Sequence, residues 1–191
     1  MAFATRRFAE NGFHPTSVAD IVDGVGVGKG VFYWYFPSKE DLLLEILRDA
    51  LLDLRRTQQA ALEPASDPLQ RIEFGIRASL TWSAANRDIL RLVMFARTEE
   101  AFDRALAKGR HIGNLDTARH VQDAIDAGTI APGDPIMLAV AIRGITEELS
   151  REYLDGSAPP GSELCDTAVR MCVHGLLGVP PERRGRSGQL G

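Results

Sequence analysis

The sequence predicts an all-α protein of about nine helices, and three observations support this prediction. Apolar residues recur every three or four positions along most of the chain, which is the spacing of amphipathic helices. Glycine, proline and short polar residues separate these apolar segments and are typical of helix starts and stops. We find no alternating pattern of the kind that indicates a β-strand, and no internal repeat.

The first three predicted helices are short. The first lies within "FATRRFAENGF" and ends at Gly12. Ser17 can cap the second helix, with Asp20 three residues later closing a capping box, and this helix ends at Gly24. A third helix follows a tight turn and extends to about Tyr35.

The later helices are longer. One begins at Lys39, because leucines recur there at steps of three or four, and it fades near "EPASDP". Asp-Pro pairs at 67–68 and 134–135 start two further helices, since aspartate caps a helix and proline suits its first position. Between them, "RDILRLVMFA" predicts a short apolar helix and the following segment up to "DAG" predicts one or two helices. A last helix covers residues 162–177.

Composition indicates an ordinary globular protein. The chain has 191 residues, 45% of them hydrophobic and 25% charged, with a net charge of −4. No segment approaches the ~20 apolar residues that a membrane span needs, and no basic-then-apolar leader precedes the first helix. Cys165 and Cys172 lie two helical turns apart, too far for a disulfide within one chain, so we expect reduced, buried thiols and a cytoplasmic location.

The stretch "GVGVGKGVFYWYF", residues 24–36, raises the question of a phosphate-binding loop. The P-loop pattern fails, because its first glycine falls on Asp23 and its final hydroxyl residue falls on Gly30. The dinucleotide pattern fails too, since its last glycine falls on Lys29 or Val31. Neither pattern has the preceding β-strand that it requires. Nucleotide binding is therefore not predicted here.

A helix-turn-helix fits the same stretch. In this arrangement the second helix enters the major groove of DNA while the first crosses the backbone. The glycines permit a left-handed turn and a close approach of the two helices. Val27 and Val31, four residues apart, are expected to pack inward, and so are Phe32 and Phe36. The rings between those two phenylalanines cannot all point inward on a short helix.

The segment from Phe8 to Leu47 resembles the DNA-binding domain of the TetR family of transcriptional regulators. The shared features are F-A-x-x-G-F, T-S-V-x-D-I, G-V-x-K-G, F-Y-x-Y-F and S-K-E-x-L-L, in this order. The resemblance implies a helix-turn-helix DNA-binding domain at 1–47 and an effector-binding and dimerisation domain at 48–178. Residues 179–191 are rich in proline, glycine and arginine and are expected to be disordered.

The resemblance also implies which residues contact double-stranded DNA. The glycine turn and the start of the third helix match positions nearest the base edges, and the three central aromatic residues match positions that face the operator. The start of the second helix and the start of the long helix match phosphate contacts. The implied set is Thr16, Ser17, Val27, Gly28, Lys29, Gly30, Val31, Tyr33, Trp34, Tyr35 and Lys39.

Two features depart from the family pattern. A polar residue usually stands where this chain has Gly28. The chain also begins inside the first expected helix, without the usual basic segment before it, and residues 1–48 contain five basic and six acidic side chains. Because phosphate neutralisation supplies much of the affinity for DNA, we expect weak and salt-sensitive binding. Two alternatives account for the missing basic charge: the start of the chain is truncated, or affinity for DNA rests on neutral donors and dimerisation.

The C-terminal domain is expected to dimerise, since a two-fold dimer reads two halves of a palindromic operator. The last two long helices are the expected interface, although an ordinary internal core remains an alternative for their apolar residues. The predicted interface residues are Leu138, Ala141, Ile142, Ile145, Leu149, Val169, Cys172 and Leu176.

The middle helices are expected to enclose a pocket for a largely apolar effector. Its predicted apolar residues are Trp82, Leu90, Met94, Phe95 and Phe102, and its predicted polar residues are Asn86, Arg91, His111, Asn114 and Glu147. By the resemblance, the protein is expected to be a repressor that the effector releases from DNA. We predict no cofactor and no metal.

The sequence favours neither of two other functions. An enzyme is not favoured, because the histidines are scattered and no metal-binding pair, C-x-x-C or nucleophile elbow occurs. A sequence-independent DNA-packaging protein is not favoured either, because the net charge is negative and the apolar C-terminal part is large.

Overall fold

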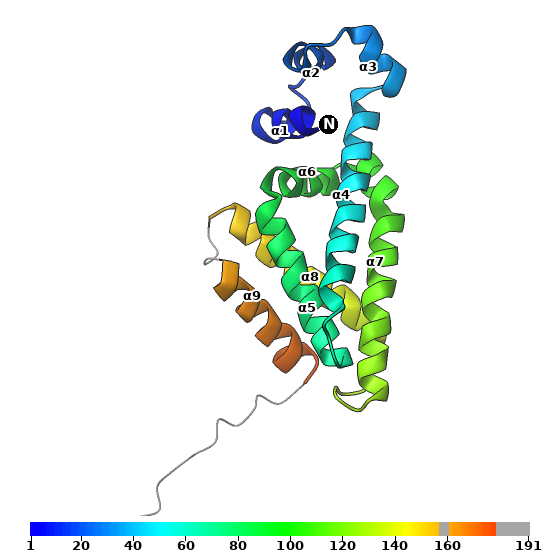
Figure 1. The fold of residues 1–191 in the computed structure, drawn as a ribbon, viewed down its shortest axis with the longest axis vertical. Coiled ribbons are helices and arrows are strands. Elements are labelled where there is room, and N and C mark those ends of the chain that lie inside the picture. The colour runs from blue at the N-terminus through cyan, green and yellow to red at the C-terminus, as the bar shows by residue number, and fades with distance from the viewer. Residues whose placement is uncertain (157–160, 179–191) are drawn as a thin grey trace, which may run out of the picture.

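The computed structural model describes residues 1–156 and 161–178. Within these residues the chain forms nine α-helices and one π-helical segment, which confirms the predicted all-α class (Figure 1). The predicted disordered tail, residues 179–191, lies outside the described residues.

The first three helices form a compact N-terminal head at one end of the molecule (Figure 1). They are α1 (Ala2–Asn11), α2 (Val18–Val25) and α3 (Lys29–Tyr35). The Phe8 and Phe32 side chains are buried between them, as the helical spacing predicts for Phe32.

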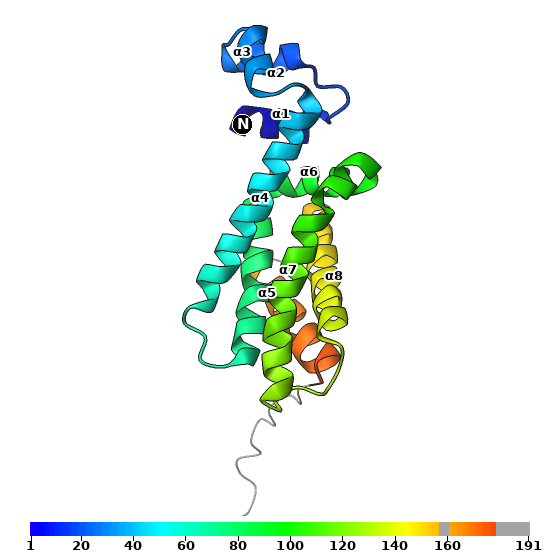
Figure 2. The same ribbon diagram turned by 90° about the vertical axis from the view of Figure 1, so that its right-hand side faces the viewer.

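One long helix connects the head to the body. It is α4 (Lys39–Leu62), which leaves the head and runs down the length of the bundle in both views (Figures 1 and 2). The predicted domain boundary at residue 47 therefore falls inside a continuous helix. The body adds α5 (Pro68–Ala85), α6 (Arg87–Thr98), α7 (Glu100–Asp126), α8 (Pro135–Leu154) and α9 (Gly161–Val169).

The caps predicted from the Asp-Pro pairs are present. The Asp67 carboxylate accepts a hydrogen bond from the backbone N–H of Gln70 at 2.9 Å. The Asp134 carboxylate accepts from the N–H groups of Ile136 and Met137. Each aspartate thus satisfies backbone donors that a helix start leaves unpaired. The segment predicted as one or two helices is the single helix α7.

Two apolar clusters hold the molecule together, and the first crosses from head to body. It joins the head to the first turns of α4 and to α6 and α7, and its members include Phe8, Phe13, Leu43, Leu92 and Phe102. The second lies between α5, α7, α8 and α9. In both views α6 lies between α1 and the lower bundle (Figures 1 and 2). A shift of α6 would therefore displace the head residues that pack against it.

The last predicted helix is divided. α9 is followed by a π-helical segment, Arg170–Leu176, in which the N–H of Leu177 donates to the carbonyl of Cys172, five residues earlier, at 2.8 Å. Cys165 and Cys172 are both buried and reduced, as predicted.

Burial raises the pKa of the Cys172 thiol to about 11. Because the thiolate is the reactive form, we expect Cys172 to react with an aromatic disulfide reagent about a hundredfold more slowly in the folded protein than in the unfolded chain. The measurement is absorbance on reagent addition at about pH 8, in a Cys165→Ser background that leaves one thiol. Equal rates with and without denaturant would contradict this expectation.

Candidate nucleic-acid interface and ligand cavity

The turn between α2 and α3 is built by a cap and a left-handed glycine. The Ser17 hydroxyl accepts from the N–H of Asp20, and the Asp20 carboxylate accepts from the Ser17 N–H at 2.8 Å, which confirms the capping box. The Ser17 hydroxyl, which donates to the Asp20 carboxylate at 2.7 Å, and then the Ser17 backbone N–H hold the pKa of Asp20 below its ordinary value. Gly26 then reverses the chain with φ +78°, a backbone conformation that favours glycine.

The aromatic residues of α3 divide between the core and the solvent. Phe32 is buried, and Phe36 packs against the same core. The next three residues face outward, with exposed fractions of 54% for Tyr33, 78% for Trp34 and 63% for Tyr35. The Trp34 and Tyr35 ring centres lie 4.6 Å apart in an edge-to-face arrangement. Three large rings on one short exposed helix are unusual for a free surface and typical of a binding surface.

The prediction that Val27 and Val31 pack inward is wrong. Val27 is 39% exposed and Val31 is 49% exposed. Val27 precedes α3, whose first residue is Lys29, so the four-residue helical spacing does not apply to the pair. Val31 is rotated by about 100° from Phe32, which already occupies the inward face. Gly28, Lys29 and Gly30 are exposed beside them at the start of α3.

The residues predicted to contact phosphates have contacts within the head. Thr16 is buried, and its hydroxyl donates to the carbonyl of Gly12 at 2.7 Å. The Lys39 ammonium donates to the carbonyls of Phe13, His14 and Thr16 at 3.0 to 3.1 Å. Lysine has three N–H donors, so all of them are engaged.

The Lys39 ammonium also lies 4.5 Å from the centre of the Phe13 ring, which adds a cation–π contact. Lys39 thus ties the loop before α2 to the start of α4. Contact with a phosphate would require it to release one of these carbonyls.

A cavity of about 640 Å³ lies in the body between α4, α5, α6, α7 and α8. This is the size of a small-molecule site. Its walls are mainly apolar, and they include Leu47, Leu54, Ile76, Leu90 and Met94. Gly75 and Gly113 also line it, and a Cβ added at either glycine would meet no atom within 4 Å. The missing side chains at these two positions therefore help to leave the space open.

The cavity brings together half of the predicted effector residues. Trp82, Leu90, Met94, Asn114 and Glu147 line it. The other five do not. Phe95 and Phe102 pack against Phe13 of the head, Asn86 precedes α6 and donates to the Trp82 carbonyl, Arg91 pairs with Asp88, and His111 is exposed.

Most of the polar lining was not predicted from the sequence. The unpredicted residues include Arg55 and Gln58 of α4, and the arginines Arg97 and Arg143. A signal was present, because Arg143 interrupts the apolar run "IMLAVAI", and a charge on the apolar face of a helix is costly unless it is paired. Trp82, on α5, donates its indole N–H to the Asp53 carboxylate of α4 at 2.7 Å.

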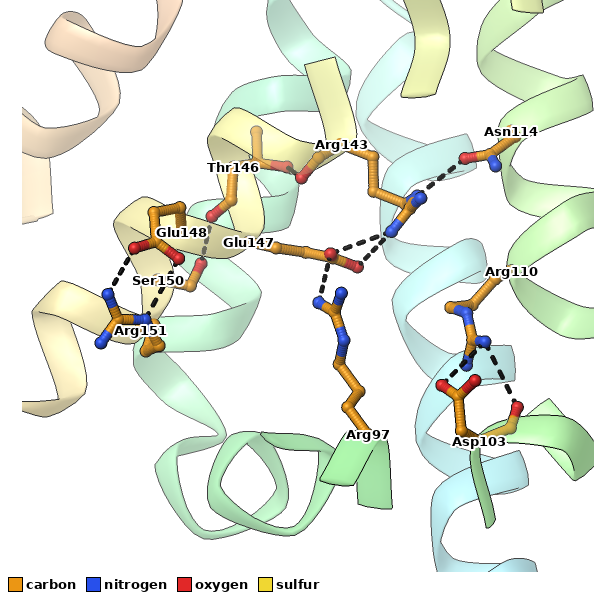
Figure 3. A network of polar contacts seen from close by, with 10 residues as sticks. All are labelled: Arg97, Asp103, Arg110, Asn114, Arg143, Thr146, Glu147, Glu148, Ser150 and Arg151. Atoms are coloured by element: carbon orange, nitrogen blue, oxygen red, sulfur yellow. Dashed lines mark hydrogen bonds and ion pairs between the residues drawn. The ribbon is translucent and has the colours of Figure 1, made fainter. Parts of the chain in front are cut away.

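Figure 3 shows the polar cluster on one wall of the cavity. The Glu147 carboxylate accepts from Arg97 Nη1 at 2.6 Å and from Arg143 Nη1 at 2.9 Å. Arg143 Nε donates to the Asn114 side-chain oxygen at 2.9 Å. Two cations from α6 and α8 therefore share one carboxylate.

Another polar group of the cavity has no hydrogen-bond partner within the described residues. It is the buried Nδ1 of His120 on α7. Burial, followed by the nearby charge of Arg71, lowers the pKa of His120, so its ring is neutral at pH 7.

The predicted interface residues fall into two groups. Ile142, Val169 and Cys172 are buried within a single chain, so a partner could contact their helices but not these side chains. The others, Leu138, Ala141, Ile145, Leu149 and Leu176, are half-buried. Ile136, Met137 and Met171 are the large exposed apolar residues of the same two segments.

Within residues 1–156 and 161–178, no helix is both long and apolar enough to cross a membrane. The same part of the chain holds no group of three or more histidine, cysteine, aspartate or glutamate side chains suited to a metal ion.

Comparison with known proteins supports the resemblance of the head to the TetR family. Residues 1–46 match the model described as bacterial regulatory proteins, tetR family. The transcriptional repressor KstR2 of Mycolicibacterium smegmatis is 38% identical over 72 residues, covering 38% of this chain and 35% of that protein. This match therefore spans only about a third of the relative's length.

Two similar proteins cover most of the chain. The transcriptional activator FasR of Mycolicibacterium smegmatis is 24% identical over 193 residues, covering 94% of this chain and 82% of that protein. The solved structure of the fatty acid degradation regulator FadR from Bacillus halodurans has a TM-score of 0.84 at 17% identity, covering 92% of this chain and 93% of that one. The structural similarity shows a shared fold, and all three proteins are named as regulators.

Proposed function

We propose that this chain, whose N-terminal domain belongs to the tetR family of bacterial regulatory proteins, is a DNA-binding transcriptional repressor released from its operator by a small-molecule effector. The observation that carries the proposal is the exposed surface of α3, where Tyr33, Trp34 and Tyr35 point away from the core. It lies directly after a capped turn, in the position of the helix that enters the major groove.

The operator is proposed to be a palindrome read by a homodimer. One short recognition helix reads few base pairs, and a two-fold dimer doubles the contact. On α8, Met137, Ala141 and Gly144 follow one another at helical spacing, and on the last segment Met171 and Gly175 do the same. These two stripes of apolar and small residues, exposed except for the half-buried Ala141, are the proposed contact between protomers. The proposed location of the protein is the cytoplasm.

Release follows from how the cavity is attached to the head. Leu47 of α4 and Leu90 of α6 line the cavity, and both helices belong to the apolar cluster that includes the head. An effector that separates these helices would favour a different spacing of the two heads. Because an effector can shift the equilibrium only by its differential affinity, effector and operator binding must oppose each other equally.

The test is selection of bound DNA from a random pool, followed by a mobility-shift titration. We expect one palindromic sequence to be enriched and its affinity to fall by more than about tenfold between ~50 and ~300 mM salt, because phosphate contacts release counterions. Enrichment of no sequence over bulk DNA would refute the proposal. A reporter assay after deletion of the gene decides between repression and activation. Loss of a repressor increases expression from the operator, and loss of an activator decreases it.

A further inference from the structure

The cavity carries a charge opposite to that of the whole protein. The chain has a net charge of −4, yet the cavity lining contains three carboxylates, Asp116, Asp123 and Glu147, against six arginines, Arg55, Arg71, Arg97, Arg110, Arg119 and Arg143. Asp103 pairs with Arg110 from outside the lining, and Asp53 accepts a hydrogen bond from Trp82 from outside it, which leaves an excess of one positive charge. A concave site with this local field attracts anions.

The excess arises because arginines share carboxylates. Asp116 accepts hydrogen bonds from both Arg55 and Arg119. Glu147 accepts from both Arg97 and Arg143, as Figure 3 shows. Each such triad keeps one uncompensated positive charge. An arginine with free donors presents a planar pair of N–H groups that suits a carboxylate or phosphate group.

The triad at Glu147 has unused donors that border apolar surface. Arg97 binds Glu147 through Nη1 alone, and its Nε and Nη2 have no partner among the described residues. Nη2 of Arg143 is likewise without a partner in that part of the chain. Arg97 also continues a stripe on α6 that faces the cavity with Leu90, Val93 and Met94.

Within the proposed function, and resting on it, we propose that the effector is an amphipathic anion. Its apolar body lies between α4, α5 and α6, and its carboxylate or phosphate monoester binds Arg97 and Arg143 in competition with Glu147. The apolar walls alone would accept a neutral molecule equally well. The arginine pair is what selects the anion, because a carboxylate or phosphate accepts charge-assisted hydrogen bonds from the unused Arg97 and Arg143 donors, whereas a neutral head group forms only the weaker, uncharged kind.

The test compares molecules with one chain and different head groups. Dodecanoate, dodecyl phosphate, dodecan-1-ol and dodecyltrimethylammonium are titrated into the full chain by calorimetry, below their micelle concentrations. We expect one or both anions to bind at least about tenfold more tightly than the alcohol, and the cation to bind more weakly still. The tighter anion identifies the acidic group. Equal affinities for anions and alcohol, or no binding of either anion, would overturn the inference.

Two substitutions in the triad should act in opposite directions. Arg97→Gln is expected to lower anion affinity by about tenfold, and Glu147→Gln to raise it, because the competing carboxylate is removed. Affinity for dodecan-1-ol should stay unchanged in both variants, which shows that the cavity is intact. Arg104→Gln is the control, since Arg104 is exposed, pairs with Glu100 and does not line the cavity. Lower anion affinity in Glu147→Gln would contradict the inference.

This inference and the proposed function fail separately. If the anions bind at Arg97 but operator affinity is unchanged, release by this effector is refuted while the anion site stands. If another compound releases the operator and the anions bind no better than the alcohol, the reverse holds.

Discussion

Replacing Trp34 by alanine is expected to weaken operator binding by about ten- to hundredfold, because each good contact in the groove is worth roughly 1–3 kcal/mol. The thermal unfolding midpoint should not change. Trp34 is 78% exposed, so alanine removes little buried surface and leaves no cavity. The measurements are a mobility-shift titration on the selected operator and a calorimetric melt of the same preparation.

The matched control is an exposed apolar residue outside the head. Leu52 on α4 is also largely exposed, so Leu52→Ala should leave both operator affinity and the melting midpoint unchanged. If Trp34→Ala bound the operator as tightly as the unsubstituted protein, α3 would not be the helix that enters the groove.

Replacing Lys39 by methionine is expected to destabilise the head by about 2–3 kcal/mol, since hydrogen bonds from a charged donor are the strong ones. The carbonyls of Phe13, His14 and Thr16 would lose their partner, and the Phe13 ring would lose the cation above it. Operator affinity should fall as a consequence, because the loop before α2 is no longer held against α4. Denaturant unfolding gives the stability change.

Lys29 provides the comparison for Lys39. It is exposed at the start of α3 and makes no hydrogen bond among the described residues. Lys29→Met should therefore weaken operator binding and reduce its salt dependence without changing stability. Should Lys39→Met be as stable as Lys29→Met, the role assigned to the Lys39 ammonium would be incorrect.

The fold could be predicted from the sequence because its signals are local. Caps such as Ser17 and Asp67 and the periodic leucines of α4 depend on residues a few positions apart, and these elements are present as predicted. The inward packing of Val27 and Val31 was mispredicted because helical spacing was extended across Gly28, which precedes α3.

The cavity depends on which helix faces meet, and a single sequence does not contain that information. Phe95 and Phe102 are large apolar residues of the middle helices, as Met94 is, yet they pack against the head and do not line the cavity. The role of Lys39 was equally hidden, since its three acceptors lie more than twenty residues earlier in the chain. Arg143 was visible as a charge within an apolar run, but its partner Glu147 identifies a site only when Arg97 approaches from α6.

The two tryptophans of the chain occupy different environments, so ligand binding and DNA binding each have their own fluorescent reporter. Trp34 is on the outer surface of α3, whereas Trp82 is buried against the cavity with its indole bonded to Asp53. In a Trp34→Phe background, all indole emission comes from the cavity wall, so its quenching follows ligand entry. With Trp82→Phe instead, the remaining emission follows DNA docking, so parallel stopped-flow experiments on the two variants time ligand entry and DNA binding separately.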